Sequence, residues 1–143
     1  MKKINHKAII VLLPIYSRSI IVVFEWNFSQ ILSLAKSHQI KVDKFSQQMK
    51  DAFYGQGLCC QFGDDNVDIL IWCKVFPDRA SNYGVLYHEI YHAVDAIAHQ
   101  IDPTCGLYAQ DGLSEARAYL YEYIVTCCNK VLWAKETKKN KKK

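Results

Sequence analysis

Four short apolar runs, rich in β-branched side chains, constrain the fold of this chain more than any other feature. They cover residues 8–13, 19–26, 58–62 and 67–73. Each run has the length and composition of a β-strand, and turn-forming sequences separate the two members of each pair. The segment 63–66, Gly-Asp-Asp-Asn, is typical of a tight turn, so we expect the second pair to form a hairpin.

The remaining segments carry apolar residues at helical spacing. Helices are predicted over residues 29–38, 43–54, 83–100 and 114–134. Candidate residues that start or cap them are Asn27, Asp43, Ser81 or Asn82, and Ser114. The resulting element order is ββααββαα, which predicts an α+β domain.

Length and composition favour one ordinary domain over residues 1–134. The chain has 143 residues, of which half are hydrophobic, so it can bury a core without disulfide staples. Residues 135–143 contain six lysines and one glutamate and account for the net charge of +4, leaving the body at −1. We expect this Lys-rich segment to be a disordered, solvated tail. A nucleic-acid-binding role is disfavoured, because the near-neutral body offers no basic face.

The N-terminus superficially resembles a signal peptide. Lys2, Lys3 and Lys7 precede the apolar run at 8–13, but Pro14 interrupts that run and no small-x-small cleavage site follows. The run is also too short to span a bilayer, so we expect no membrane association. Buried strands explain the pattern better than a targeting segment does.

The six cysteines indicate a reducing compartment. Most lie inside apolar runs, where cysteine behaves as a small hydrophobic residue, and none forms a Cys-x-x-Cys motif. We therefore expect free thiols and a cytoplasmic protein.

Residues 88–92 form a motif that predicts a metal-binding site. They read His-Glu-Ile-Tyr-His and lie within the helix predicted over 83–100. Positions four apart lie on one helix face, so His88 and His92 can bind one metal ion together. Glu89 projects beside them and can take a proton from a water molecule that the metal activates. Zinc, one ion per chain, fits these ligands best, although manganese, cobalt and iron also accept them.

A third protein ligand is needed, and Glu115 is the best candidate. It begins the last predicted helix, after a loop long enough to reverse the chain, and small Ala116 and Ala118 permit close helix packing. His99 shares the face of the motif histidines but lies too far along one straight helix, while Glu122 is a fallback ligand. Supporting roles are conceivable for Asp95 as a hydrogen-bond acceptor from a ligand histidine and for Tyr119 and Tyr123 as donors to an oxyanion.

The two motif segments resemble small metallopeptidase-like proteins of bacteriophages and mobile elements. Those proteins carry a His-Glu-x-x-His helix and a downstream Glu-Ala-x-Ala-Tyr helix, matched here by residues 88–92 and 115–119. The pattern is also similar to gluzincins. The resemblance implies a zincin-like α+β fold, a small and mainly antiparallel sheet, and a long C-terminal helix. It assigns His88, His92 and Glu115 as zinc ligands and Glu89 as the general acid and base.

The resemblance also implies a function and a substrate. It indicates a zinc-dependent metallopeptidase acting on a peptide or protein, with residues 67–73 as the edge strand that pairs with an extended substrate. The alternative is a non-catalytic, zinc-bearing phage structural or interaction protein with a phage or host protein as its partner. The location expected for a phage protein is the host cytoplasm, or the virion.

Overall fold

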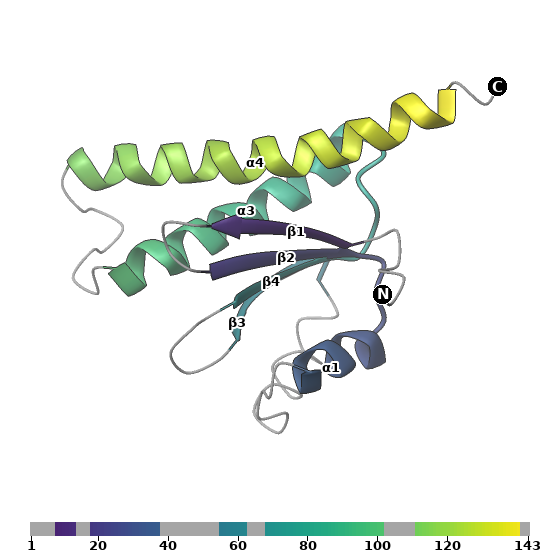
Figure 1. The fold of residues 1–143 in the computed structure, drawn as a ribbon, viewed down its shortest axis with the longest axis horizontal. Helices are drawn as coiled ribbons and strands as arrows, with labels where there is room; N and C mark the ends of the chain where they lie inside the picture. The colour runs from purple at the N-terminus through teal and green to yellow at the C-terminus, as the bar shows by residue number, and fades with distance from the viewer. Residues whose placement is uncertain (1–7, 14–17, 38–54, 63–67, 102–110, 141–143) are drawn as a thin grey trace. The chain divides into compact units, whose positions relative to one another are not determined.

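The computed structural model describes residues 8–13, 18–37, 55–62, 68–101 and 111–140. Within them lie four strands and three helices (Figure 1). These are β1 (Ala8–Leu13), β2 (Arg18–Phe24), α1 (Phe28–Ser37), β3 (Gly57–Phe62), β4 (Asp68–Cys73), α3 (Ala80–Ile101) and α4 (Asp111–Asn140). The α+β class is confirmed, and the strand positions agree with the apolar runs to within two residues. The helix predicted over 43–54 falls outside the described residues.

The strands form one sheet in the order β1-β2-β4-β3. The pair β1–β2 is antiparallel, with Ala8 opposite Val23, and so is the pair β3–β4, with Gly57 opposite Cys73. The two pairs join through a parallel contact between β2 and β4, where Ile20 lies opposite Ile69. The sheet is therefore mixed, with antiparallel pairing on both sides of one parallel junction.

This topology corrects the prediction that residues 67–73 form the edge strand. β4 lies inside the sheet, between β2 and β3, and all five residues from Ile69 to Cys73 are buried. A continuous apolar run suits a strand with neighbours on both sides and cover on both faces. Among the described residues, β3 pairs only with β4, so the edge strand of this half of the sheet is β3.

Opposite faces of the sheet carry alternate side chains, as the pleat requires. On one face, Ile21, Val23, Leu70 and Trp72 form a core with Ile31 of α1. The indole Nε1 of Trp72 donates a 2.9 Å hydrogen bond to a main-chain oxygen of the loop that leads into α1. This bond satisfies the one polar atom of the largest buried side chain.

The start of α1 is capped as its sequence predicts. Asn27 Oδ1 accepts a 3.0 Å hydrogen bond from the Gln30 amide, and Gln30 Oε1 accepts a 2.9 Å bond from the Asn27 amide. This reciprocal pair is a capping box, in which two amides that the helix cannot satisfy find side-chain partners.

Both long helices extend beyond their predicted bounds. α3 begins at Ala80, ahead of the expected caps, and the Asn82 side chain instead donates a 2.9 Å hydrogen bond to Asp78 Oδ1. α4 begins at Asp111, so Ser114 lies inside the helix and not at its cap. α4 also continues to Asn140, so residues 135–140 of the expected disordered tail are helical, and residues 141–143 lie outside the described part.

The chain forms two compact units, Met1–Glu89 and Ile90–Lys143, and α3 runs without interruption from the first into the second. In the second unit, α4 buries Ile124, Cys128 and Leu132, which repeat every four residues along one face. Arg117 of α4 forms a 3.2 Å ion pair with Asp95 of α3.

Two further features of the described residues bear on the sequence-based expectations. The five described cysteines, at positions 59, 60, 73, 127 and 128, are all free thiols. None of the described helices combines the length and apolar character needed to cross a membrane.

Candidate metal and catalytic site

The motif residues lie in the middle of α3, where the sequence predicts them. The helix continues for eight residues before His88 and nine after His92, so both histidines have regular helical backbone on each side. The two imidazoles are exposed, whereas Glu89 is only 7% exposed and is the sole charged residue buried among those described. This stretch of helix therefore presents two accessible imidazole side chains and one enclosed carboxylate.

The enclosed carboxylate of Glu89 lies directly against Gly57, the first residue of the edge strand β3. A β-carbon built on Gly57 would lie 2.7 Å from Glu89 Oε1, 2.8 Å from Glu89 Cγ and 2.9 Å from Val85 Cγ1. Separations this short do not occur between real side chains, so only glycine allows the helix and the strand to approach so closely. Gly57 is thus part of the cradle that holds the carboxylate.

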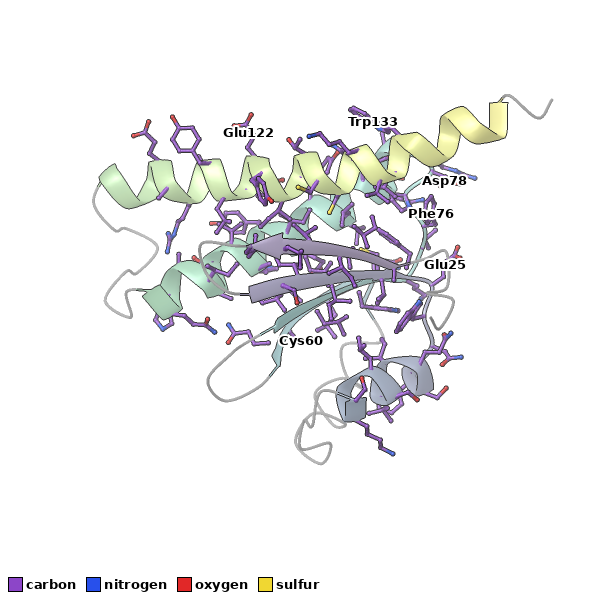
Figure 2. All side chains as sticks on the ribbon, viewed as in Figure 1. Glu25, Cys60, Phe76, Asp78, Glu122 and Trp133 are labelled. Carbon is purple, nitrogen blue, oxygen red and sulfur yellow. The ribbon has the colours of Figure 1, made fainter. Side chains whose placement is uncertain are left out.

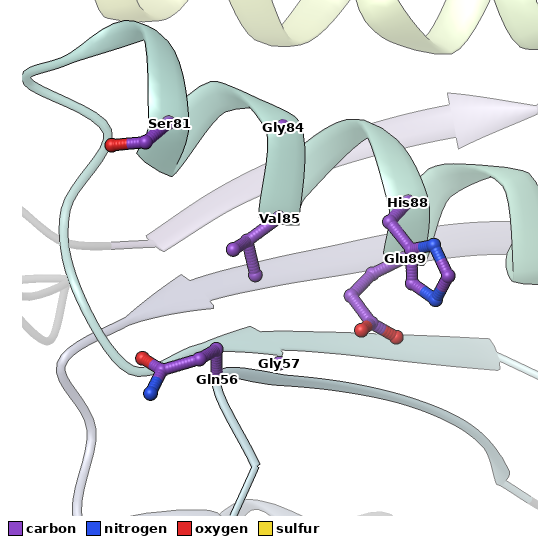
Figure 3. Close-up of a pocket in the computed structure, with 7 residues that line it drawn as sticks. All are labelled: Gln56, Gly57, Ser81, Gly84, Val85, His88 and Glu89. Carbon is purple, nitrogen blue, oxygen red and sulfur yellow. The ribbon is translucent and has the colours of Figure 1, made fainter.

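A pocket of about 450 Å³ opens beside this contact (Figure 3). Gln56 and Gly57 line it from the start of β3. From α3 the lining residues are Ser81, Gly84, Val85, His88 and Glu89. Figure 3 shows the side chains of His88 and Glu89 next to each other at one end of this pocket, with the Glu89 carboxylate directed toward Gly57. The volume is in the range of pockets that hold small ligands or single side chains.

The negative charge of Glu89 contributes to the raised pKa values of two thiols of β3. Burial, and then the negative charge of Glu89, raise the pKa of the Cys59 thiol to about 12. The pKa of Cys60 is also raised, chiefly by burial and less by its neighbours Cys59 and Glu89. Both thiols are therefore protonated at neutral pH and are poor nucleophiles and poor metal ligands.

Glu115, the expected third ligand, lies on α4 and is exposed. Because α4 begins at Asp111, Glu115 occupies the second turn and not the first. Its Oε1 accepts a long, 3.5 Å hydrogen bond from the hydroxyl of Tyr119, one turn further along the same helix. Tyr119, weighed above as an oxyanion donor, thus contacts the proposed ligand directly.

The other residues that the sequence suggested for the site are not among those that line the pocket. Asp95 pairs with Arg117, which fixes one of its carboxylate oxygens on a guanidinium. His99 and Glu122 are both exposed, and Figure 2 shows Glu122 projecting outward from α4. Tyr123 is 46% exposed, and a hydrogen bond with Cys127 is the main cause that raises its pKa.

Of the expected site residues, the structure brings His88 and Glu89 together around one pocket. In the part of the chain that it describes, no three His, Cys, Asp or Glu side chains converge closely enough to hold a metal ion. His88 and Glu89 belong to the first compact unit, whereas His92 and Glu115 belong to the second.

Sequence reasoning missed Gly57 and Gln56 as members of the site. The segment 55–57, Gly-Gln-Gly, follows the helix predicted over 43–54, and two glycines around a polar residue are typical of a turn that ends a helix. A glycine at the start of a strand is also a signal of close backbone approach, and that signal would have pointed to Gly57.

Comparisons with protein-family models, with curated proteins and with solved structures find no match to this chain.

Proposed function

We propose that this protein is a zinc-dependent metallopeptidase of zincin type, with His88, His92 and Glu115 as zinc ligands and Glu89 as the general base. The observation that carries the proposal is the placement of Glu89. It is the one buried charged residue among those described, and it lines the same pocket as His88. It also packs against Gly57, where the side chain of any other residue would collide with it. Burying a carboxylate is costly, so a carboxylate at this place favours a catalytic role.

The donor set fits zinc. Two imidazoles one helical turn apart and a carboxylate from another helix are the ligand types of catalytic zinc sites. Both histidines are exposed, so their nitrogens are accessible to an ion from solution. A zinc ion held there supplies a Lewis acid that lowers the pKa of a water molecule and polarises a carbonyl group.

Glu89 would carry the proton. Its carboxylate accepts a proton from the attacking water, whose oxygen forms the new bond to the peptide carbonyl carbon. The carbon–nitrogen bond then breaks, and Glu89 passes the same proton to the nitrogen of the leaving amine. The cradle at Gly57 keeps the carboxylate in one position through both transfers.

The edge strand β3 offers a way to hold the substrate. Gly57 begins β3, and β3 has a partner on one side only within the described residues. An extended peptide could pair with the open side through main-chain hydrogen bonds, which bind without regard to most side chains. The strand proposed to pair with the substrate is therefore β3, and not residues 67–73 as the sequence predicted.

The test is cleavage of a mixed peptide library by zinc-loaded protein, followed by mass spectrometry. We expect defined cleavage products from the wild type and a loss of at least about a hundredfold in rate for Glu89→Gln, which removes the base but keeps the shape. Glu122→Gln, an exposed glutamate on α4, is the matched control and should cleave at the wild-type rate. Equal activity of Glu89→Gln and wild type would refute the catalytic assignment.

A non-catalytic zinc-bearing interaction protein of a phage remains the alternative function. It is favoured by the exposed aromatic side chains of α4, Tyr119, Tyr123 and Trp133, which are 46–66% exposed. Large exposed aromatics are enriched at protein interfaces. Zinc binding without any peptide cleavage, together with loss of partner binding in Trp133→Ala, would select this alternative.

A further inference from the structure

Glu115, the proposed third zinc ligand, lies on the side of α4 that faces away from α3. Arg117 of α4 pairs with Asp95 of α3 at 3.2 Å, so the side of α4 that bears Arg117 faces α3. Residues two apart along an α-helix are separated by about 200° around its axis, so Glu115 is directed to the opposite side. In agreement with this direction, Glu115 is exposed, whereas Ile124, about two and a half turns further along α4, is buried.

His92 and Glu115, which belong to the same compact unit, therefore do not converge within one chain. Among the residues that the structure describes, no three possible ligands lie close enough together to hold a metal ion. We propose that the zinc site is completed between two copies of this chain, with His88 and His92 from one copy and Glu115 from the other. This inference rests on the proposed function, because it concerns the zinc ligands named there, and it adds the partner that completes the site.

The side of α4 that bears Glu115 has the composition of a protein–protein contact surface. Tyr119, one turn beyond Glu115, donates a 3.5 Å hydrogen bond to its carboxylate and is 66% exposed. Trp133 lies about five turns beyond Glu115 on the same side of the helix and is 57% exposed. Large aromatic side chains are enriched at protein interfaces. A second copy that takes Glu115 as a ligand would also cover these two aromatic side chains.

The helix α3 offers a complementary surface around the motif histidines. His88 and His92 are exposed, and so is Tyr91, whose ring lies edge-on to that of His92 with the centroids 6.1 Å apart. The nearest carboxylates along α3 are engaged elsewhere, since Glu89 is buried and Asp95 is held in an ion pair. To complete the ligand set, the histidines still need a carboxylate, and the exposed side of α4 presents one. Because each copy carries both surfaces, a two-fold dimer would form two identical sites.

The test mixes two defective full-length variants, so that only a shared site can be complete. His88→Ala/His92→Ala keeps Glu115, whereas Glu115→Gln keeps both histidines. The two are mixed in equal amounts in a chelator, and zinc is then restored at a free concentration that saturates the wild type and leaves Glu115→Gln largely empty. In a mixed dimer the histidines of one variant meet Glu115 of the other, so one of the two sites is complete. We expect the mixture to bind at least about one zinc ion per four chains, and either variant alone almost none.

The matched control mixes Glu115→Gln with the triple variant His88→Ala/His92→Ala/Glu115→Gln. Every dimer in this mixture lacks Glu115, so zinc binding should not be restored. Sedimentation equilibrium of the wild type, which needs no variant to fold, should show a dimer when zinc is bound. Three results would each overturn the inference: a variant mixture that binds no more zinc than its components, restoration in the control mixture, or a zinc-loaded wild-type monomer.

These outcomes are separate from those that decide the proposed function. A zinc-loaded monomer that cleaves the peptide library would overturn the shared site and retain the metallopeptidase, because all ligands would then come from one chain. Restored zinc binding in the variant mixture, without peptide cleavage by the wild type, would retain the shared site and refute the peptidase. A wild type that binds no zinc would refute both.

Discussion

At position 57 the absence of a side chain makes room for the carboxylate of Glu89, and this contact can be tested by stability alone. Gly57→Ala should lower the free energy of unfolding by about 2 kcal/mol, because the new methyl group overlaps Glu89 and Val85. Gly84→Ala is the matched control, because its methyl group meets open space on the same pocket. It should change stability by about 0 to 1 kcal/mol in the favourable direction. Urea denaturation measures both, and equal effects would contradict the close contact.

The raised pKa of Cys59 predicts a pH dependence of stability. The thiol has a pKa of about 12 in the folded protein and an ordinary value of 9.0, so folding favours its protonated form. Its contribution is therefore complete below pH 9 and is lost as the pH rises from 9 toward 12. Urea denaturation at pH 7.5, 9 and 10 under reducing conditions should show a decline that is smaller in Cys59→Ala. The same decline in both proteins would argue that Cys59 is not buried beside Glu89.

At the scale of elements, the capping box of α1 can be tested directly. Asn27→Ala removes the side-chain acceptor for the Gln30 amide and should cost about 1 kcal/mol of unfolding free energy. Asn27→Asp keeps an acceptor at the same place and should change stability by only about a few tenths of a kcal/mol. Urea denaturation compares the three proteins. The box would not be a stabilising feature if the alanine and aspartate variants were alike.

The elements also show how far local sequence signals reach. Strand positions followed from β-branched runs, and the cap at Asn27 followed from a short-range signal, so both could be predicted. The pairing of β2 with β4 could not, because it joins residues about fifty positions apart and no local pattern specifies which strand lies beside which. The error about the edge strand had this cause.

Helix ends were predicted less well than helix positions. Ser114 and Asn82 are good caps by type, yet both lie inside their helices, since neighbouring residues with adequate propensity extended the structure past them. The same applies to residues 135–140, where lysine-rich sequence suits a solvated helix as well as it suits a disordered tail. Charge composition alone does not distinguish the two.

For the whole molecule, the position of the candidate residues on one helix could be predicted from the sequence, and their surroundings could not. The His-Glu-x-x-His spacing identified His88, Glu89 and His92 from the helix period alone. The role of Gly57 could not be predicted, because it depends on contact with Glu89, a residue 32 positions away along the chain. Of the two residues inside the motif, Ile90 is buried and Tyr91 is 52% exposed, so only one of them faces the core.

Removal of zinc should destabilise the protein as a whole. A zinc ion that binds the folded protein through the proposed ligands, His88, His92 and Glu115, would stabilise the folded state relative to the unfolded state. At a free zinc concentration about a thousand times the Kd, binding adds about 4 kcal/mol to the free energy of unfolding. A chelator should therefore lower the thermal midpoint of the wild type and leave that of His88→Ala/His92→Ala unchanged. An equal midpoint with and without the chelator in the wild type would contradict zinc binding by the folded protein.

The most direct test of the central claim is the zinc content of the purified protein after saturation with zinc and dialysis, measured by mass spectrometry of the element. We predict one zinc ion per chain in the wild type, none in His88→Ala/His92→Ala and substantially less than one in Glu115→Gln. His99→Ala and Glu122→Gln, which change exposed residues on the same two helices, should retain one ion. A wild type that takes up no zinc, or a double variant that keeps it, would contradict the assignment of a zinc site to His88, His92 and Glu115.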